Sequence, residues 1–329
     1  MPPSEWNVLD FEKPIAELDA QIAEIKRLSL ERGEDHSEDI ATLEQDRDRL
    51  LSEIFANLSP WDKTLLARHP KRPYTLDYVR IIFDDYTELH GDRLFADDHA
   101  MVGGMATLDG RQVMFVGQQK GRDLKDRQYR NFGSAKPEGY RKALRLMKLA
   151  AKFKRPVICF VDTPAADVSV GSEERGISEA IARNMMEIST LETPIIVVVV
   201  GEGGSGGAIG IAVGDRVLML ENSIYSVIPP EGCAAIIWRD ATKGKEAAEA
   251  LKITSEEALS LGIIDEIIPE PLGGAHRNVE LTSKNLKASL LKHLDELAKL
   301  KTNKLVDERY KKFRGMGAYA EMEVVSEEE

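Results

Sequence analysis

Hydrophobic residues near the start of the chain recur at steps of three and four positions, which is the period of one helix face. The first series is Ile15, Leu18, Ile22, Ile25 and Leu28, and the second, after the charged residues 31–36, is Ile40, Leu43, Leu50, Ile54 and Phe55. Two such stripes with a polar break between them predict a helical hairpin with charged outer faces. We therefore assign residues 1–70 to an N-terminal helical hairpin, with the role of a brace or a subunit contact.

The pattern changes after this segment, and short apolar runs then alternate with helical stretches. The apolar runs lie at 100–107, 112–118, 156–161, 194–200, 216–220 and 224–228, and the helical patterns lie near 138–154, 173–190, 205–213, 231–238 and 244–252. Short runs rich in valine and isoleucine between helices are typical of strands buried on both faces. Residues 71–275 are therefore expected to form one α/β core, followed by a helical segment at 276–316 and a flexible acidic tail at 317–329.

Composition narrows the class of protein. The 329 residues carry a formal net charge of -12, so the molecule as a whole should repel nucleic acid and anionic membranes. The chain has no long uncharged apolar run and no signal peptide at its start, so we expect a cytoplasmic protein without a membrane partner. Its two cysteines, Cys159 and Cys233, stand in apolar surroundings and are expected to be buried thiols.

Two turns from strand to helix carry the candidate chemistry. The first leads from a strand into residues 162–164 and a loop of small residues, with a helix near 172–174. The second leads from a run of four valines into the glycine-rich residues 201–207 and a short helix. Glycine lets a backbone approach a ligand closely, and N–H groups at a helix start point outward. Such a bend can hold a phosphate or stabilise an oxyanion formed during a reaction.

A nucleotide site is one alternative for the second turn. Gly201, Gly203 and Gly206 have the spacing G-x-G-x-x-G after a strand, and Glu221 follows twenty residues after Gly201. That is the fingerprint of dinucleotide binding. The helix that follows is short for a crossover, and the motif comes late in the chain, so NAD binding remains the weaker alternative.

Four long stretches together carry a more specific resemblance. They are HGDRLFADDHAMVGGMA (90–106), KGRDLKDRQYRNFGSAKPEGYRKALRLMKLAAKF (120–153), GEGGSGGAIGIAVGDRVLMLENSIYSVIPPEGCAAIIW (201–238) and LKITSEEALSLGIIDEIIPEPLGGAHR (251–277). In order and spacing they resemble the alpha subunits of bacterial acetyl-CoA carboxylase carboxyltransferases, and the similarity covers nearly all of residues 5–316. The resemblance implies a crotonase-like spiral of ββα units with a helical N-terminal extension and a helical C-terminal segment.

The resemblance also implies an activity and a set of partners. Such a subunit transfers the carboxyl group of carboxybiotin, presented by the biotin carboxyl carrier protein, to acetyl-CoA, and so forms malonyl-CoA for fatty acid biosynthesis. It is active only with a beta subunit, as an alpha2beta2 complex that works with biotin carboxylase. The beta subunit holds the zinc and most CoA contacts. No metal and no covalently bound cofactor is expected on this chain.

The site residues are carried over by family position. Gly206 and Gly207 would donate backbone N–H groups to the ureido oxygen of biotin, and Ala165, Ala166, Gly203 and Gly204 would line the carboxybiotin pocket. Charge would build on that oxygen when CO2 leaves, and the biotin nitrogen would remove a proton from the acetyl group. No side-chain base is required by this chemistry, which relies on preorganised N–H donors.

The first turn departs from the family pattern DTPGAYPG followed by ERGQ. This chain has Ala165, Asp167, Val168 and Ile177 where the family has glycine, tyrosine, proline and glutamine, and PPEG replaces SPEG at 229–232. Ala165 requires a negative φ, because alanine at positive φ is strained. Asp167 would face solvent, meet a basic residue or slow turnover. The altered turn makes a non-catalytic scaffold one alternative, and a carboxyltransferase or decarboxylase for another acyl-CoA is a second alternative among enzymes.

Other polar residues have ordinary structural interpretations beside functional ones. Basic residues at 120–145 are interpreted as a cradle for anions, as an RNA-binding surface or as a partner-facing surface; they are Lys120, Arg122, Lys125, Arg127, Arg130, Lys136, Arg141, Lys142 and Arg145. The six histidines show no paired metal spacing. His90-Gly91-Asp92 and Asp97-Asp98-His99 are expected in turns, and Ser205 is expected to be a small spacer or cap.

Overall fold

One sheet runs through the core of the molecule, for which the computed structural model describes residues 8–33 and 35–317. Within these residues its strands are β1 (Asp85–Glu88), β2 (Met101–Leu108), β3 (Arg111–Gln118), β4 (Val157–Thr163), β5 (Ile195–Gly204), β6 (Arg216–Leu220), β7 (Ile224–Ser226) and β8 (Glu266–Ile268). Their order is β1-β2-β3-β4-β5-β6-β8, with β7 paired to β5. The pairs β1–β2 and β2–β3 are antiparallel, and every pairing from β3 to β8 is parallel.

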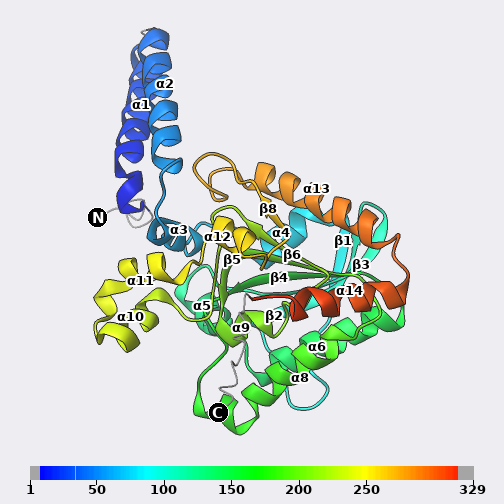
Figure 1. Cartoon of the computed structure of the whole chain (residues 1–329). Helices are drawn as coiled ribbons and strands as arrows, with labels where there is room; N and C mark the ends of the chain where they lie inside the picture. Colours follow the sequence, from blue (N-terminus) through cyan, green and yellow to red (C-terminus); the bar gives the residue numbers. More distant parts are fainter. Residues whose placement is uncertain (1–7, 34, 318–329) are drawn as a thin grey trace, which may run out of the picture.

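Helices cover both faces of the sheet, with α6 and α8 on one side and α13 on the other (Figure 1). In chain order the helices are α1 (Lys13–Arg32), α2 (Ser37–Phe55), α3 (Pro60–Ala67), α4 (Thr75–Ile82), α5 (Leu124–Tyr129), α6 (Pro137–Lys152), α7 (Val170–Glu174), α8 (Ile177–Ser189), α9 (Ser205–Ile209), α10 (Pro230–Trp238), α11 (Gly244–Leu251), α12 (Ser255–Ser260), α13 (Val279–Leu297) and α14 (Thr302–Arg314). The expected α/β class is confirmed.

The central strands are buried along their whole length. All residues of β4 and β5 are buried. Successive side chains point to opposite faces, so Cys159 packs in the core beneath α6 and α8, while Ile158 and Phe160 pack in the core beneath α4 and α13. Burial also raises the pKa of the Cys159 thiol to about 12. Cys159 and Cys233 are both buried free thiols, as predicted.

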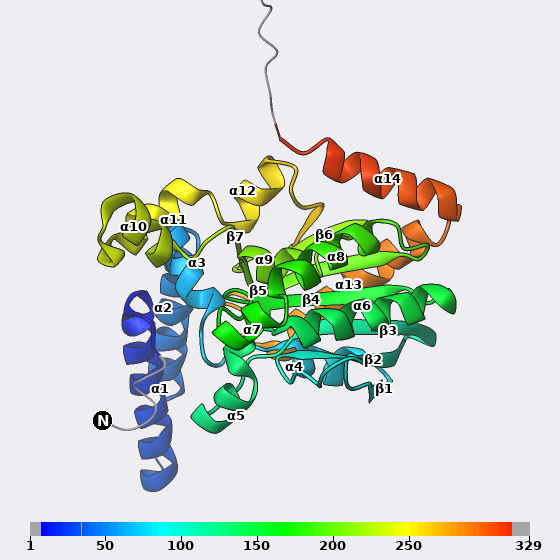
Figure 2. The same cartoon turned by 90° about the horizontal axis from the view of Figure 1, so that it is seen from below.

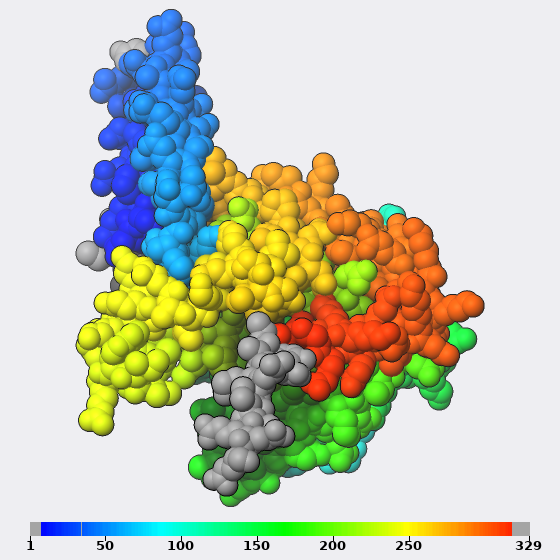
Figure 3. Space-filling model, viewed as in Figure 1, coloured from blue at the N-terminus to red at the C-terminus, as the bar shows by residue number. Residues whose placement is uncertain are grey.

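The N-terminal hairpin stands off the rest of the molecule (Figure 3). Its two helices are α1 and α2, and the chain reverses at Gly33, which has φ of 70° and caps α1. The third helix of the predicted N-terminal segment, α3, packs against α11 and β7 of the core. The hairpin proper is therefore shorter than the predicted segment of residues 1–70.

The two C-terminal helices, both labelled in Figure 2, pack at different places: α13 contacts α4, β5 and β8, and α14 contacts α8. Leu286, Leu290 and Leu294 of α13 pack onto the sheet. Arg309 of α14 is buried and binds both carboxylate oxygens of Asp215 at 2.9 and 2.8 Å. The predicted acidic tail lies, from residue 318 on, outside the described residues. Among the helices that the structure describes, none has the length and apolar character needed to cross a bilayer.

Candidate active site at two strand-to-helix bends

The two bends singled out in the sequence meet at one edge of the sheet. β4 and β5 are parallel neighbours, and Thr163 pairs with Gly203 where both strands end. A Cβ placed on Gly204 would lie 2.0 Å from the carbonyl oxygen of Pro164, and one on Gly207 would lie 2.5 Å from the carbonyl carbon of Ala165. The fold therefore brings the second bend into backbone contact with the first, as close as glycine permits.

The predicted pocket residues take different positions in this arrangement. Ala165, Ala166 and Gly206 are partly exposed at the mouth of the bends. A Cβ added to Gly206 would make an ordinary van der Waals contact with Ile181 Cδ1 at 3.5 Å. Gly203 lies inside β5, and the ring of Tyr225 would be 2.7 Å from a Cβ there. Its place in a carboxybiotin pocket stays a prediction.

Helix α9 starts directly after the strand with unpaired backbone donors in its first turn, of which Gly206 is partly exposed and Gly207 is buried. Among the described residues, the N–H groups of Gly206 and Gly207 have no hydrogen-bond acceptor, as expected for the first turn of a helix. Ser205 has φ of 51°, in the left-handed region that residues other than glycine rarely adopt. This strained residue turns the chain from strand into helix, a role that its sequence position among glycines did not reveal.

A buried network of charges lies beneath the bends. The ammonium of Lys120 is 2.8 Å from Asp162 and 2.7 Å from Glu202, and Arg68 pairs with Glu202 at 2.5 Å and with Glu231 at 2.5 Å. Burial lowers the pKa of Lys120, but the two carboxylates outweigh burial, so the pKa lies above its usual value. Burial raises the pKa of Glu202, yet Lys120 and Arg68 bring it below the usual value. Both cations at the site are thus paired with carboxylates.

Several members of the basic segment are likewise paired. The described carboxylate partners are Asp77 for Arg122, Asp126 for Arg130, Asp92 for Arg141 and Asp97 for Lys142. The pairs of Arg141 and Lys142 hold the loop between β1 and β2 against α6, that of Arg122 reaches α4, and that of Arg130 lies at the end of α5. Neutralised charges of this kind give little attraction for a polyanion, so the cradle and RNA interpretations lose support.

Asp167, the unusual acid of the first bend, is held by neutral donors. Its carboxylate accepts hydrogen bonds from the hydroxyls of Ser169 and Ser172, both at 2.5 Å, and from the amide of Asn131 at 3.1 Å. Burial raises the pKa of Asp167, but these three hydrogen bonds outweigh burial, so the pKa lies below its usual value. Ala165 does not adopt positive φ, so alanine is tolerated without backbone strain at this position, as the prediction required.

A cluster that the sequence did not predict joins the hairpin to the core. Glu12, His69 and His276 lie close enough to hold a metal ion, and His276 Nε2 is 3.5 Å from Glu12 Oε1. The imidazole rings of His69 and His276 are stacked, with centroids 4.0 Å apart and planes at 25°. Lone pairs of stacked rings run nearly parallel, so the two rings cannot both point at one ion without rotating. The expectation that the chain holds no metal stays a prediction.

The two histidine-containing loops have the turn roles expected of them. One oxygen of Asp92 accepts from the backbone N–H groups of Leu94, Phe95 and Ala96. His90 binds Asp97 at 3.0 Å, and His99 stacks on the ring of Tyr129. These contacts stabilise the loop between β1 and β2.

The dinucleotide interpretation does not fit the geometry. Gly201 and Gly203 belong to strand β5 rather than to a loop, and α9 is five residues long. The space beside Gly201, where a phosphate-binding turn would be open, is filled by the carboxylate of Asp162 at 2.4 Å. The spacing of glycines therefore reflects close packing of strands and bends.

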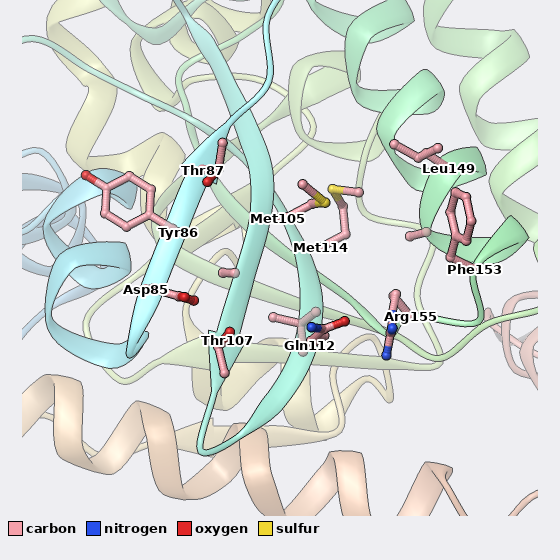
Figure 4. Close-up of a pocket in the computed structure, with 13 residues that line it drawn as sticks. Asp85, Tyr86, Thr87, Met105, Thr107, Gln112, Met114, Leu149, Phe153 and Arg155 are labelled. Atoms are coloured by element: carbon pink, nitrogen blue, oxygen red, sulfur yellow. The ribbon is translucent and has the colours of Figure 1, made fainter.

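A separate groove of about 450 Å³ lies at the other end of β3 (Figure 4). Met105, Met114, Leu149, Phe153 and Arg155 line it, together with the polar edge of β1. The bends lie near Gln118, at the opposite end of β3 from Gln112 and Met114. The groove is therefore distinct from the candidate site.

Comparison with known proteins places the chain among carboxyltransferases. A family model described as acetyl co-enzyme A carboxylase carboxyltransferase-like matches residues 8–317. The acetyl-coenzyme A carboxylase carboxyl transferase subunit alpha of Geobacter metallireducens is 58% identical over 313 residues, covering 95% of this chain and 98% of the relative. The subunit of the same name from Methylococcus capsulatus is 53% identical over the same shares of the two chains.

Solved structures share the fold at low identity. The beta subunit of P. aeruginosa geranyl-CoA carboxylase has a TM-score of 0.54 at 15% identity and covers 77% of this chain and 45% of its own. A Pseudomonas malonate decarboxylase hetero-tetramer in complex with coenzyme A has a TM-score of 0.53 at 18% identity, with 64% of this chain and 84% of that chain covered. The expected crotonase-like fold is thereby confirmed.

Proposed function

Because the chain belongs to the acetyl-CoA carboxylase carboxyltransferase family, as one of its alpha subunits, we propose that the bends after β4 and β5 form the carboxybiotin half of the active site. Carboxyl transfer to acetyl-CoA is the function of this family. The observation that carries the proposal is the pair of unbonded N–H groups on Gly206 and Gly207, of which Gly207 lies against the backbone of Ala165 and Ala166. Such donors stabilise an oxygen that gains negative charge.

The chain's own backbone performs the catalytic task in this proposal. When the bond between CO2 and the biotin nitrogen breaks, the electron pair moves onto the ureido group, and the N–H groups of Gly206 and Gly207 stabilise its oxygen. The biotin nitrogen then takes a proton from the methyl group of acetyl-CoA, and the enolate attacks CO2 to form malonyl-CoA. Preorganised backbone donors require no rearrangement as this charge develops.

The surrounding side chains support a reaction without a side-chain base. Lys120, Asp162 and Glu202 are tied into buried ion pairs beneath the bends. Glu202 is held between Lys120 and Arg68 and is a poor proton acceptor, because proton uptake would weaken both ion pairs. Burial raises the pKa of Asp162, but its side chain is only 1% exposed and lies beneath the bends. We therefore assign the proton of acetyl-CoA to biotin.

Exposed apolar residues beside the bends support a partner that completes the site. Val168 in the first bend is 92% exposed, and Val170 in α7 is 75% exposed. Apolar surface of this kind is typical of a protein contact. We assign it to a beta subunit in an alpha2beta2 complex, which holds the zinc and the CoA. The biotin carboxyl carrier protein and biotin carboxylase complete this cytoplasmic system for fatty acid biosynthesis.

The test is carboxyl transfer in reverse, with free biotin and malonyl-CoA as substrates. The chain alone should be inactive, and its mixture with a beta subunit of the same family should produce acetyl-CoA. Gly206→Val should lower kcat at least about a hundredfold by covering the N–H groups, while Gly206→Ala should stay within about threefold. An assembled Gly206→Val complex with full activity would show that these amides do not bind the ureido oxygen.

The altered first bend favours a second candidate, a non-catalytic scaffold for the beta subunit and the carrier protein. Asp167 places a negative charge next to a site that must stabilise one. A mixed complex that turns over at ordinary enzyme rates, above about 1 per second, excludes the scaffold. Comparing acetyl-CoA with propionyl-CoA in the forward direction tests the alternative acyl acceptor.

A further inference from the structure

The side chain of Gln118 connects the two bends from the end of the neighbouring strand β3. Its Nε2 donates to the carbonyl oxygen of Gly207 at 3.0 Å, and its Oε1 accepts from the backbone N–H of Asp162 at 3.1 Å. Gln118 is fully buried. We propose that Gln118 is a positioning residue for carboxyl transfer, which sets the spacing of the bends and the direction of the Gly207 N–H group. This inference rests on the proposed function of the bends.

The two contacts allow one orientation of the Gln118 amide. Its nitrogen faces a carbonyl oxygen and its oxygen faces an N–H group, so the reversed amide would place donor against donor and acceptor against acceptor. A side chain at this position must therefore offer one donor and one acceptor at fixed places. Neither an apolar side chain nor a carboxylate can do so.

Tyr140 holds the same carbonyl from the other side. Its hydroxyl donates to the Gly207 oxygen at 3.1 Å, and its ring packs where a Cβ on Gly210 would lie, 2.6 Å from Cε1. Burial raises the pKa of Tyr140, so the phenol keeps its proton over the working pH range. The Gly207 carbonyl thus accepts hydrogen bonds from two buried side chains.

This clamp compensates for a weak local structure. α9 is five residues long, and the glycines in it have the largest backbone freedom of any residue. Gly210 N–H bonds to the Gly206 carbonyl at 3.1 Å, but so short a helix gives little stability by itself. Fixing the Gly207 carbonyl restricts ψ of Gly207, and the close backbone of Ala165 limits how far the preceding peptide, which carries the Gly207 N–H, can turn. A preorganised donor to an oxyanion depends on the direction of this N–H bond.

The test compares variants in the complex with a beta subunit, with free biotin and malonyl-CoA as substrates. Gln118→Met keeps the length of the side chain and removes both contacts, so kcat should fall about tenfold to a hundredfold while KM for malonyl-CoA changes less than about threefold. Tyr140→Phe leaves the Gln118 donor in place and should lower kcat by about threefold to tenfold. If the Gln118→Met and Tyr140→Phe chains each assembled with the beta subunit and each kept the wild-type kcat, the inference would be overturned.

The neighbouring Gln119 provides a matched control. It is also buried, accepts from the Leu76 N–H at 2.9 Å and donates to the Lys120 carbonyl at 2.9 Å, but its side chain makes no hydrogen bond to either bend in the part of the chain that the structure describes. Gln119→Met should therefore lower the midpoint of urea unfolding to a similar extent as Gln118→Met while kcat stays within about threefold. An equal loss of kcat in both variants would assign Gln118 a general structural role instead.

A carboxyl substitution adds a readout that a structural role would not move. When protonated, the new group of Gln118→Glu offers one O–H donor and one acceptor, like the amide it replaces. Burial and the facing Gly207 carbonyl favour the protonated form. The ratio of variant to wild-type kcat should therefore fall as the pH rises from about 6 to about 8. A ratio independent of pH would contradict the positioning role.

The isolated chain distinguishes failure of this inference from failure of the proposed function. Amide hydrogen exchange over residues 204–210 should be faster in Gln118→Met than in Gln119→Met, whichever reaction the complex catalyses. Equal exchange in the two variants would overturn the clamp itself. Faster exchange in Gln118→Met, combined with an inactive wild-type complex, would support the clamp and reject the proposed function.

Discussion

Gly207 lies directly against the backbone of Ala165, so that a Cβ on the glycine would be 2.5 Å from the alanine carbonyl carbon. The same Cβ would be 2.6 Å from the nitrogen of Ala166. These atoms are backbone and cannot rotate away as a side chain can. The contact therefore determines which residue can stand at position 207, and it ties the shape of the second bend to that of the first.

We predict that Gly207→Ala loses activity and stability together. The added methyl group forces the two bends apart, which should lower the free energy of unfolding by about 1–3 kcal/mol. A displacement of the Gly207 N–H by about 1 Å should lower kcat of the complex by about a hundredfold. Urea unfolding and the reverse transfer assay measure the two effects. Gly206→Ala is the control, because its Cβ meets Ile181 at an ordinary 3.5 Å.

Lys120→Met should destabilise the chain by about 3–5 kcal/mol, because it leaves the buried carboxylates of Asp162 and Glu202 without their shared cation. Equilibrium unfolding in urea at neutral pH measures the change. Lys26→Met is the matched control, since Lys26 pairs with Glu44 in an exposed contact. That change should cost less than about 1 kcal/mol. Equal losses in the two variants would show that the network contributes no more than a surface pair.

Asp98 should make stability depend on pH in the mildly acidic range. Burial raises the pKa of Asp98 to about 6, and the charge of Glu138 acts in the same direction. The hydrogen bonds from the N–H groups of Ala100 and Lys136 and the charge of Lys142 lower the pKa but do not outweigh burial. Because the pKa is raised in the folded state, the contribution of Asp98 to the free energy of unfolding is fully present below its ordinary pKa. It is lost as the pH rises through about 6.

Comparison with Asp98→Asn isolates this contribution. The free energy of unfolding of the wild type, minus that of the variant, should fall by about 3 kcal/mol from about pH 3.8 to about pH 6 and then level off. Urea unfolding at a series of pH values measures this difference. A difference that rises with pH would mean that the carboxyl is stabilised in its ionised form.

Glu12→Ala should release the hairpin from the core. Glu12 is 3% exposed, accepts from the Leu9 N–H at 3.2 Å and faces His276 at 3.5 Å and Arg277 at 3.9 Å. Without the carboxylate, amide hydrogen exchange should rise across α1 and α2 while the sheet stays protected. Glu24→Ala, which removes an exposed pair with Arg27, should leave the exchange of both regions unchanged. Unchanged exchange in Glu12→Ala would show that other contacts hold the hairpin.

The sequence predicted the elements whose signal is local. The buried runs around Ile158 and Val198 became β4 and β5, because continuous valine and isoleucine between helices suits a strand covered on both faces. The short strands β1 and β8 were missed, because Asp85–Glu88 and Glu266–Ile268 carry no such run. The glycines at 201 and 203 were interpreted as a loop, yet the strand continues through them to Gly204.

Only those parts of the candidate site that stand in local sequence motifs were predicted. Gly206, Gly207, Ala165 and Ala166 stand in motifs that can be recognised along the chain, and the fold places them together. The charge network and the stacked His69 and His276 had no signal in the sequence, since their members lie far apart along the chain.

The sequence by itself determined the long buried strands, the two bends and the family, because each depends on residues near one another in the chain. Only the tertiary structure decided which groups hold the bends in place. Gln118 lies 44 residues from Asp162 and 89 residues from Gly207, and it meets both because parallel strands end at one edge of the sheet. Contacts of that range depend on how the strands are ordered and packed, which no local pattern specifies.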